Sequence, residues 1–257
     1  MDNEISESAK AVQEVAKTTR VGIEATEKLG GFVSRIIDEP LNNVIGILSD
    51  RLRFMRAERQ LRLVDRWREI MDKRKISAQL RTVSPKLALP IIEAASIEEN
   101  DELQDLWINL LTSAVDPNFN SIVRSAFIDI IKQLEVIDVH ILSAIYEETV
   151  SKNLKYLNKY PSEARSRSFI KYGIRDWDVT QKLKVTSEIY EESVDNLMRV
   201  RCVAPYVEEL SVDSEVDGKK YGETVSLVHE FEYVRITALG LSFIQACTHP
   251  KELEKNI

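Results

Sequence analysis

Residues 84–117 read SPKLALPIIEAASIEENDELQDLWINLLTSAVDP, and this stretch predicts two short helices joined by an acidic turn. In its second half the apolar residues recur at the spacing of one helix face. Asn100 can cap the start of that helix, and the acids that follow it suit the positive end of the helix dipole. Pro117 ends the helix, because proline disfavours helical backbone in the residue before it. We expect the apolar face to anchor the core through Leu103, Leu106, Trp107, Leu110 and Leu111.

The first half of the stretch carries its own apolar stripe. Pro85 suits a first helical turn, whereas Pro90 is expected to bend the segment or delay its start. The two helices then form a hairpin. Trp107 is the largest side chain on the seam, and we interpret it as a core anchor rather than a ligand-facing residue. The upstream stripe consists of Leu87, Ile91, Ile92 and Ala95.

The run ASIEENDELQDLWINLLTSAVDP resembles the signature of the abortive infection alpha (Abi-alpha) family of bacterial antiphage defence proteins. An acidic helix start, a Leu-x-x-Leu-Trp-x-x-Leu-Leu core and a closing Asp-Pro carry the resemblance. The upstream run GILSDRLRFMRAERQLRLVDR is similar to the family as well, so the resemblance covers roughly residues 41–149. It implies a role in antiphage defence and implies no known reaction. The matching core positions are Leu103, Leu106, Trp107, Leu110 and Leu111, followed by Asp116 and Pro117.

Composition narrows the class of protein. A chain of 257 residues with 44% apolar residues can bury one large core or two smaller ones. Eight glycines and seven prolines are few for this length, which favours helices. The net charge of −7 argues against broad nucleic-acid binding. Cys202 and Cys247 fit buried thiols in a reducing compartment, so we expect a cytoplasmic protein, and the family resemblance implies a bacterial one. No run of ~20 apolar residues predicts a transmembrane helix.

Two consecutive segments carry opposite charge. Residues 51–75 hold ten Lys or Arg against four acids, whereas residues 85–120 hold seven acids and one Lys. A basic helix face of this kind predicts an acidic partner surface, nucleic-acid phosphates or anionic lipid. We favour a solvated face or a partner within the chain, namely the acidic hairpin. The candidate interaction surface comprises Arg51, Arg53, Arg56, Arg59, Arg62 and Arg66.

The ends of the chain predict further units. Residues 1–40 form an amphipathic pattern with a weak seam, which suggests a docked or oligomerising helix. Residues 41–156 are predicted to be a helical domain, residues 157–175 a linker, and residues 176–257 a winged-helix-like domain with a hairpin turn at Asp217 and Gly218. The fold class is therefore mainly α: long N-terminal helices and a helical bundle, followed by a C-terminal α+β domain.

The predicted recognition helix of the winged-helix-like domain is acidic. Glu188, Glu191, Glu192 and Asp195 precede its first base, Arg199, so its early turns would repel DNA phosphates. A protein-contacting or structural domain is favoured over a DNA-reading one.

No recognisable reaction centre is present in the sequence. It contains no phosphate-binding glycine loop, no metal-ligand spacing of His or Cys, and no nucleophile elbow, so we expect no catalytic residue, cofactor or metal. The leading hypothesis is a non-enzymatic defence protein that acts by assembling with itself or with a protein partner. The alternatives are a winged-helix regulator of nucleic acid and a membrane-active effector using residues 30–48. An unrecognised enzyme ranks fourth.

Overall fold

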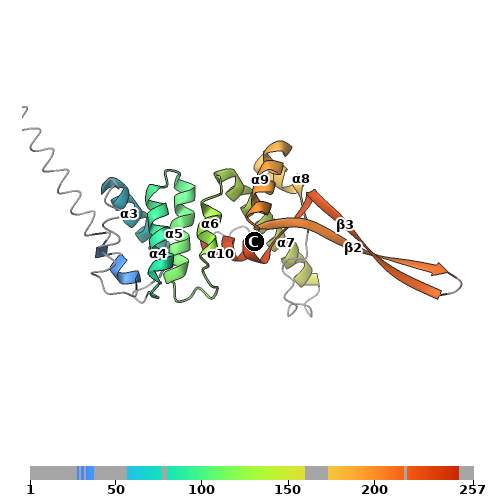
Figure 1. Ribbon diagram of the computed structural model, residues 1–257, viewed down its shortest axis with the longest axis horizontal. Helices are drawn as coiled ribbons and strands as arrows, with labels where there is room; N and C mark the ends of the chain where they lie inside the picture. Colours follow the sequence, from blue (N-terminus) through green and yellow to red (C-terminus); the bar gives the residue numbers. More distant parts are fainter. Residues whose placement is uncertain are drawn as a thin grey trace, which may run out of the picture. The chain divides into compact units, whose positions relative to one another are not determined.

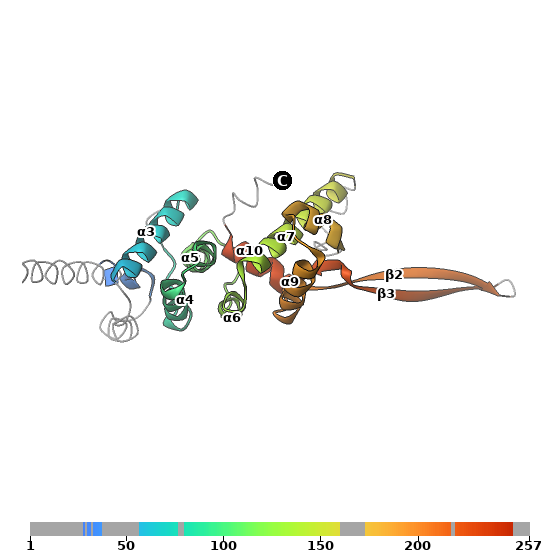
Figure 2. The ribbon, with the colours of Figure 1, turned by 90° about the horizontal axis from the view of Figure 1, so that it is seen from above.

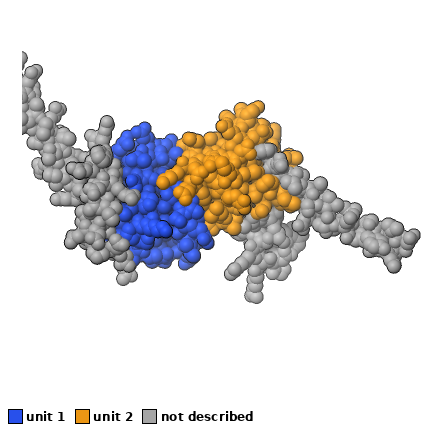
Figure 3. All heavy atoms as spheres, in the orientation of Figure 1, with its two compact units in different colours: residues 1–128 blue, residues 129–257 orange. Residues whose placement is uncertain are grey.

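The computed structural model describes residues 28, 30–31, 33–37, 57–76, 80–159, 173–216 and 219–248 (Figure 1). The chain divides into two units, Met1–Ile128 and Asp129–Ile257 (Figure 3). The described part is mainly helical, with a three-stranded antiparallel sheet near the C-terminus, which confirms the predicted fold class. The division lies upstream of the linker that the sequence suggested at residues 157–175.

Helices α3 (Ala57–Arg74), α4 (Pro85–Ile97) and α5 (Asp101–Val115) make up most of the described part of the first unit. Helix α3 packs against both members of the α4–α5 hairpin. A short parallel bridge joins Ile37 to Val83 at the edge of this group. The core is apolar side chains from all three helices, among them Leu63, Trp67, Ile70, Ile91, Ile92, Ala95, Leu106, Trp107 and Leu110.

Local sequence explains where these helices begin and end. The side chain of Asn100 accepts from the backbone N–H groups of Glu102 and Leu103, so it caps α5 as predicted. Lys75 adopts a left-handed φ of 54°, and the next N–H returns to the carbonyl of Met71 at 3.1 Å, which closes α3. The predicted delay at Pro90 is wrong, because α4 starts at Pro85 and continues through Pro90. The missing N–H of Pro90 falls early in the helix, where it removes one of the first intrahelical bonds and leaves the rest intact.

The second unit is built around one long helix, α7 (Val136–Lys159). Helix α6 (Ala126–Ile131) spans the division between the units, and α7 follows it. Helices α8 (Asp176–Leu183), α9 (Ser187–Arg199) and α10 (Ala238–Cys247) pack on α7. The sheet comprises β1 (Ile174–Arg175), β2 (Val203–Val216) and β3 (Lys219–Ile236) in the order β1-β3-β2. The core side chains of this unit include Ile141, Leu142, Ile145, Val179, Tyr190, Val194, Leu197, Val234, Ile236 and Phe243.

Several features of this region depend on packing. Helix α7 continues to Lys159, because no glycine or proline interrupts it before residue 160. Ile122 precedes α6 and is 72% exposed. Ile189 on α9 is 42% exposed, because it lies at the edge of the buried face of that helix. That buried face consists of Tyr190, Ser193, Val194 and Leu197.

Caps and one close approach fix α9, β2 and α10. The hydroxyl of Thr186 accepts from the N–H of Ile189, and that of Thr237 accepts from the N–H of Gly240 at 2.9 Å. The N–H of Thr237 in turn donates to the carbonyl of Cys202 at 2.9 Å. The start of helix α10 therefore contacts the backbone of Cys202, the residue that immediately precedes β2. A Cβ added to Gly240 would lie 2.0 Å from the carbonyl oxygen of Cys202. A glycine is required at this position because backbone meets backbone there.

Candidate protein interaction surface

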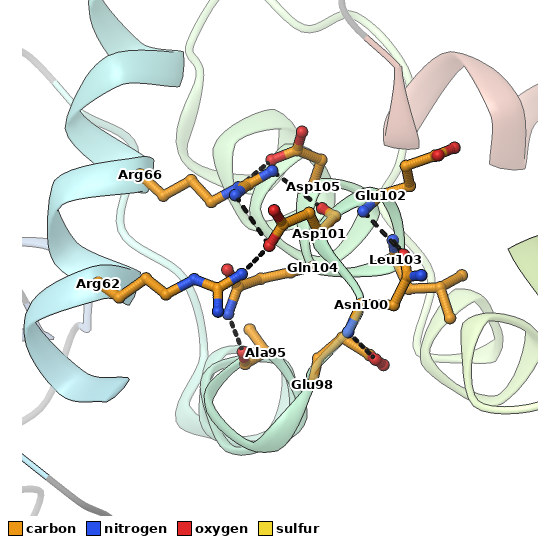
Figure 4. Close-up of polar contacts among 10 residues, drawn as sticks. All are labelled: Arg62, Arg66, Ala95, Glu98, Asn100, Asp101, Glu102, Leu103, Gln104 and Asp105. Atoms are coloured by element: carbon orange, nitrogen blue, oxygen red, sulfur yellow. Dashed lines mark hydrogen bonds and ion pairs between the residues drawn. The ribbon is translucent and has the colours of Figure 1, made fainter. Parts of the chain in front are cut away.

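The basic face of α3 lies against the acidic start of α5 within the first unit. Arg62 and Arg66 stand one turn apart on α3, and Asp101 and Asp105 stand one turn apart on α5. Residues four apart on a helix share a face, so two matched pairs form across the helices. Figure 4 shows both arginines extending from α3 toward these aspartates.

Four ion pairs carry this contact. Arg59 Nη2 lies 2.7 Å from Glu99 Oε1, and Arg62 pairs with Asp101. Arg66 contacts two acids, at 2.5 Å from its Nε to Asp105 Oδ1 and at 3.3 Å from its Nη1 to Asp101 Oδ1. Its Nη2 also donates to the Asp101 carbonyl at 3.0 Å. The sequence prediction that the acidic hairpin partners the basic helix within one chain is therefore correct for these arginines.

The pair at Arg66 is the most protected of the four. Its side chain is 24% exposed, against 42% for Arg59 and 44% for Arg62. The hydrogen bond to Asp105 raises the pKa of Arg66, and it outweighs the opposing effect of partial burial. Arg66 therefore carries a permanent positive charge, and its ion pairs fix the register of α3 against α5. The more exposed ion pairs of Arg59 and Arg62 contribute little to stability.

Two further arginines, which the sequence reading missed, contact the second half of α5 and the residues that follow the helix. The Arg74 guanidinium donates to Asn109 Oδ1 at 2.7 Å and to Ser113 Oγ at 2.9 Å. Arg81 donates to the carbonyls of Pro117 and Phe119, each at 3.3 Å. Cations at the end of a helix are favourable, because its last carbonyls carry partial negative charge. The signal in the sequence was the pair Asn109 and Ser113, which are polar residues one turn apart on an otherwise apolar face.

The six arginines of the candidate surface thus divide into two sets. Arg59, Arg62 and Arg66 lie at the α3–α5 contact, while Arg51, Arg53 and Arg56 lie outside the described residues. The predicted oligomerisation segment 1–40 falls largely outside them too, as does most of the predicted lipid-contacting segment 30–48. The five core anchors are all buried, with exposed fractions of 9% for Leu103, 5% for Leu106, 2% for Trp107, 0% for Leu110 and 3% for Leu111.

Exposed acids and exposed apolar side chains both occur on α8 and α9 of the second unit. The acids of α9 that the sequence singled out, Glu188, Glu191, Glu192 and Asp195, are all exposed. The backbone at the start of α9 and the Thr186 hydroxyl lower the pKa of Glu188, which keeps this acid charged. Trp177 on α8 is 58% exposed and Ile189 on α9 is 42% exposed. We call these residues of α8 and α9 the acidic surface.

Trp177 is the member of the acidic surface that sequence reasoning did not identify. It sits in the first turn of α8 between Asp176 and Asp178, and this placement was the available signal, since a tryptophan flanked by charges at a helix start is poorly placed for a core. Arg199, at the other end of α9, donates to the side chains of Gln133 and Asn196. The one base of α9 is therefore engaged by its own unit.

In the part of the chain that the structure describes, no group of three or more His, Cys, Asp or Glu side chains is placed to hold a metal ion. Within the same residues, no helix combines the length and the apolar composition needed to cross a membrane.

Comparison with known proteins gives one result. A family model described as abortive infection alpha matches residues 58–247, from the second residue of α3 to the end of α10. Neither the curated proteins nor the solved structures include a match.

Proposed function

The chain belongs to the abortive infection alpha family, and from this we propose that it is an antiphage defence protein that acts through contacts with other protein molecules. The family supports a role in abortive infection. The mode of action is our own inference from the surfaces of the two units, and it includes contact with a second copy of the chain or with another protein in the bacterial cytoplasm.

The acidic surface carries the proposal. Trp177 is 58% exposed and Ile189 is 42% exposed, so a partner that covers these side chains would remove apolar area from water, which favours binding. Tryptophan is also the residue type most enriched at the energetic centre of protein interfaces. A protein partner with basic side chains around an apolar patch would cover Trp177 and Ile189 while pairing with the acids of α9.

By contrast, the charged side chains of α3 support an internal role. Their pairing with α5 leaves Arg59 and Arg62 partly exposed, so a competing acidic partner would have to replace existing ion pairs. We place the partner-binding surface on α8 and α9 for this reason. Binding there does not require a reaction centre, and we propose that the protein is not an enzyme.

The second candidate function is nucleic-acid binding, and the order of elements favours it. Helix, strand, helix, helix and a two-stranded hairpin follow one another from α7 to β3, as in winged-helix modules, with the sheet order β1-β3-β2. The exposed acids of α9 oppose it, because phosphates would meet negative charge along the helix that reads DNA in such modules. A gel shift that is salt-sensitive and lost on Arg199→Glu with Arg201→Glu would favour this second candidate.

Expression under phage challenge tests the leading proposal. The test variant is Trp177→Ala with Ile189→Ala, and the matched control is Ile97→Ala, which removes a side chain that is 61% exposed from α4 in the first unit. We expect the wild type and Ile97→Ala to protect the culture and to copurify with the same partner. The double variant should fold, lose the partner and lose protection. Equal protection by all three proteins would contradict the proposal.

A further inference from the structure

Helix α8 is short, and little apolar area anchors it. Of its eight residues, Val179 and Thr180 are buried, so Val179 alone contributes a buried apolar side chain to the core. Arg175, at its N-terminal cap, makes no side-chain cap hydrogen bond. A helix of this length is not stable by itself in water. Contacts with the neighbouring elements must therefore hold α8 in its place.

Ion pairs with α7 supply part of this attachment. Lys182 of α8 contacts two acids of α7, with its Nζ 2.7 Å from Glu147 Oε2 and 3.6 Å from Glu148 Oε1. Lys152 of α7 makes the converse pair, with its Nζ 3.7 Å from Asp178 Oδ2 of α8. Each helix thus supplies one lysine to the other, and the order of the pairs shows that the two helices run in opposite directions at this contact. Figure 2 shows α8 beside α7.

Lys152 also holds the chain that precedes α8. Its Nζ donates to the carbonyl of Gly173 at 3.2 Å, and Gly173 immediately precedes β1, which leads into α8. Lys152 therefore fixes the start of this segment, while Lys182 fixes the last turn of α8. We use the name lysine clasp for the contacts of Lys152 and Lys182 with Gly173, Asp178, Glu147 and Glu148.

The lysine clasp is partly shielded from solvent. Its charged side chains are between 22% and 40% exposed. Partial burial lowers the pKa of Lys182, but the hydrogen bond to Glu147 and the charges of both acids outweigh this effect and raise the pKa. The ion pairs therefore favour the docked position of α8, and they remain exposed enough for salt to screen them.

Helix α9 is attached to α7 in a different way. It has thirteen residues, and the hydroxyl of Thr186 caps its first turn. Near its other end, the Asn196 amide donates to Asp138 of α7 at 2.7 Å, and Asp138 is 3% exposed. Its buried side chains are Tyr190, Ser193, Val194 and Leu197. Because salt screens buried groups much less than exposed ones, we expect it to weaken the attachment of α8 and to leave that of α9 nearly unchanged.

We infer that the lysine clasp is a conformational device, which holds α8 against α7 and permits α8 to open locally while α9 stays docked. Trp177 lies in the first turn of α8, so the clasp determines how this side chain is presented. Lys152 and Lys182 are therefore positioning residues for the partner contact. This last step rests on the proposed function, which assigns Trp177 to that contact, whereas the local opening of α8 does not depend on it.

Hydrogen–deuterium exchange of the full-length chain measures the local opening. Peptides that cover α8 and α9 are compared at about 20 mM and about 1 M NaCl, since the screening length falls to ~3 Å at the higher concentration. We expect exchange in α8 to accelerate by about three- to tenfold with salt, and exchange in α9 to change by less than about twofold. Helix α9 is thus the internal control in the unmodified protein.

A series of charge-removing variants attributes the effect to the clasp. Lys152→Met with Lys182→Met removes both positive charges, and the matched control is Lys132→Met, which changes an exposed lysine directly after α6. At low salt the double variant should exchange α8 about three- to tenfold faster than the wild type, and added salt should change this rate by less than about twofold. Lys132→Met should behave as the wild type does. Glu147→Gln with Glu148→Gln removes the acids that pair with Lys182 and should also accelerate exchange in α8.

Three results would overturn the inference. The first is an equal salt response of α8 and α9, and the second is an α8 that is unprotected at low salt in the wild type. The third is a full salt response that persists in Lys152→Met with Lys182→Met.

Phage protection separates the clasp from the proposed function. We expect Lys152→Met with Lys182→Met to protect less well than Lys132→Met. Full protection by a double lysine variant that opens α8 would overturn the positioning role, even where Trp177→Ala with Ile189→Ala abolishes protection. Full protection by Trp177→Ala with Ile189→Ala would overturn the proposed function and leave the exchange behaviour of α8 as it is.

Discussion

The Nε of Arg66 lies 2.5 Å from Oδ1 of Asp105, which joins the middle of α3 to the second turn of α5. The partners are separated by 39 residues in sequence, and both are partly buried. Together with Arg62 and Asp101 one turn earlier, the pair fixes the register in which the basic helix meets the acidic hairpin. The charge separation between residues 51–75 and 85–120 therefore serves, at least at α3, to position one helix against another.

We predict a measurable coupling between Arg66 and Asp105. A double-mutant cycle with Arg66→Met and Asp105→Asn should give about 0.5–1 kcal/mol, because the pair is less exposed than an ordinary surface pair. Urea unfolding followed by fluorescence in a Trp177→Phe background reports on the first unit, where the other two tryptophans lie. The control pair is Asp65 and Arg68, which are 3.5 Å apart and more than half exposed, and its coupling should be about 0.2 kcal/mol or less. Equal coupling in the two cycles would contradict the register role.

Asn100→Ala should destabilise the first unit by about 1 kcal/mol, because two backbone N–H groups of α5 lose their acceptor. Ser84→Ala is the matched control. Ser84 occupies the same position before α4 but makes no side-chain cap hydrogen bond, so its loss should change the free energy of unfolding by less than about 0.3 kcal/mol. Urea unfolding measures both, and a Ser84 effect as large as the Asn100 effect would count against the assigned cap.

Gly240→Ala should destabilise the second unit by about 3 kcal/mol, because the new Cβ meets the Cys202 carbonyl and α10 must move away from β2. Gly31→Ala serves as the control, since a Cβ at that helical position has nothing within 4 Å. It should be neutral or stabilising by up to about 1 kcal/mol. Thermal unfolding compares the two variants, and a Gly240→Ala protein with the wild-type melting temperature would show that the close approach is absent in solution.

Asn196→Ala should destabilise the second unit by about 1–3 kcal/mol, because a buried carboxylate loses a donor. The Asn196 amide donates to Asp138 Oδ2 at 2.7 Å and to the Gln133 carbonyl at 2.8 Å, and Asp138 is 3% exposed. Glu192→Ala on the exposed face of the same helix should stay within about 0.5 kcal/mol of the wild type. Chemical denaturation distinguishes them, and similar losses for both variants would rule out a specific role for Asn196.

Alkaline pH should destabilise the second unit through Cys202. Burial raises the pKa of this thiol to about 12, whereas a thiol in the unfolded chain titrates near pH ~8.5. The unfolded state therefore loses its proton first, and stability that is complete below pH ~8.5 falls as the pH rises toward about 12. The thiol should contribute a slope of up to about 1.4 kcal/mol per pH unit, and Cys202→Ala should remove that contribution from the dependence measured by denaturation between pH 9 and 11. An unchanged slope in Cys202→Ala would refute the assignment.

The part of the fold that the sequence predicted rests on short-range physics. The Asn100 cap, the start of α4 at Pro85 and the apolar stripe around Trp107 follow from residues within one or two helical turns. The contact between α3 and α5 could also be predicted from the sequence, since opposite charges recur at helical spacing on two neighbouring segments. The spacing of apolar and charged residues determines which of them share one face of a helix, and this spacing can be read from the sequence alone.

Other features depend on tertiary contacts that have no local signature. The hydrogen bond from Arg74 to Asn109 of α5 could be recognised only once the packing of α3 on α5 was known. The exposure of Ile189 depends on how far the buried face of α9 extends around the helix. The requirement for Gly240 arises from a carbonyl 38 residues earlier in the chain.

We propose that this member of the abortive infection alpha family protects cells through protein contacts at an exposed surface. The most direct test is phage challenge of a culture that expresses Trp177→Ala with Ile189→Ala, beside the wild type and Ile97→Ala, with circular dichroism to establish that all three fold. We expect the double variant to fold but no longer to protect, while Ile97→Ala protects as well as the wild type. Full protection by the folded double variant would contradict it.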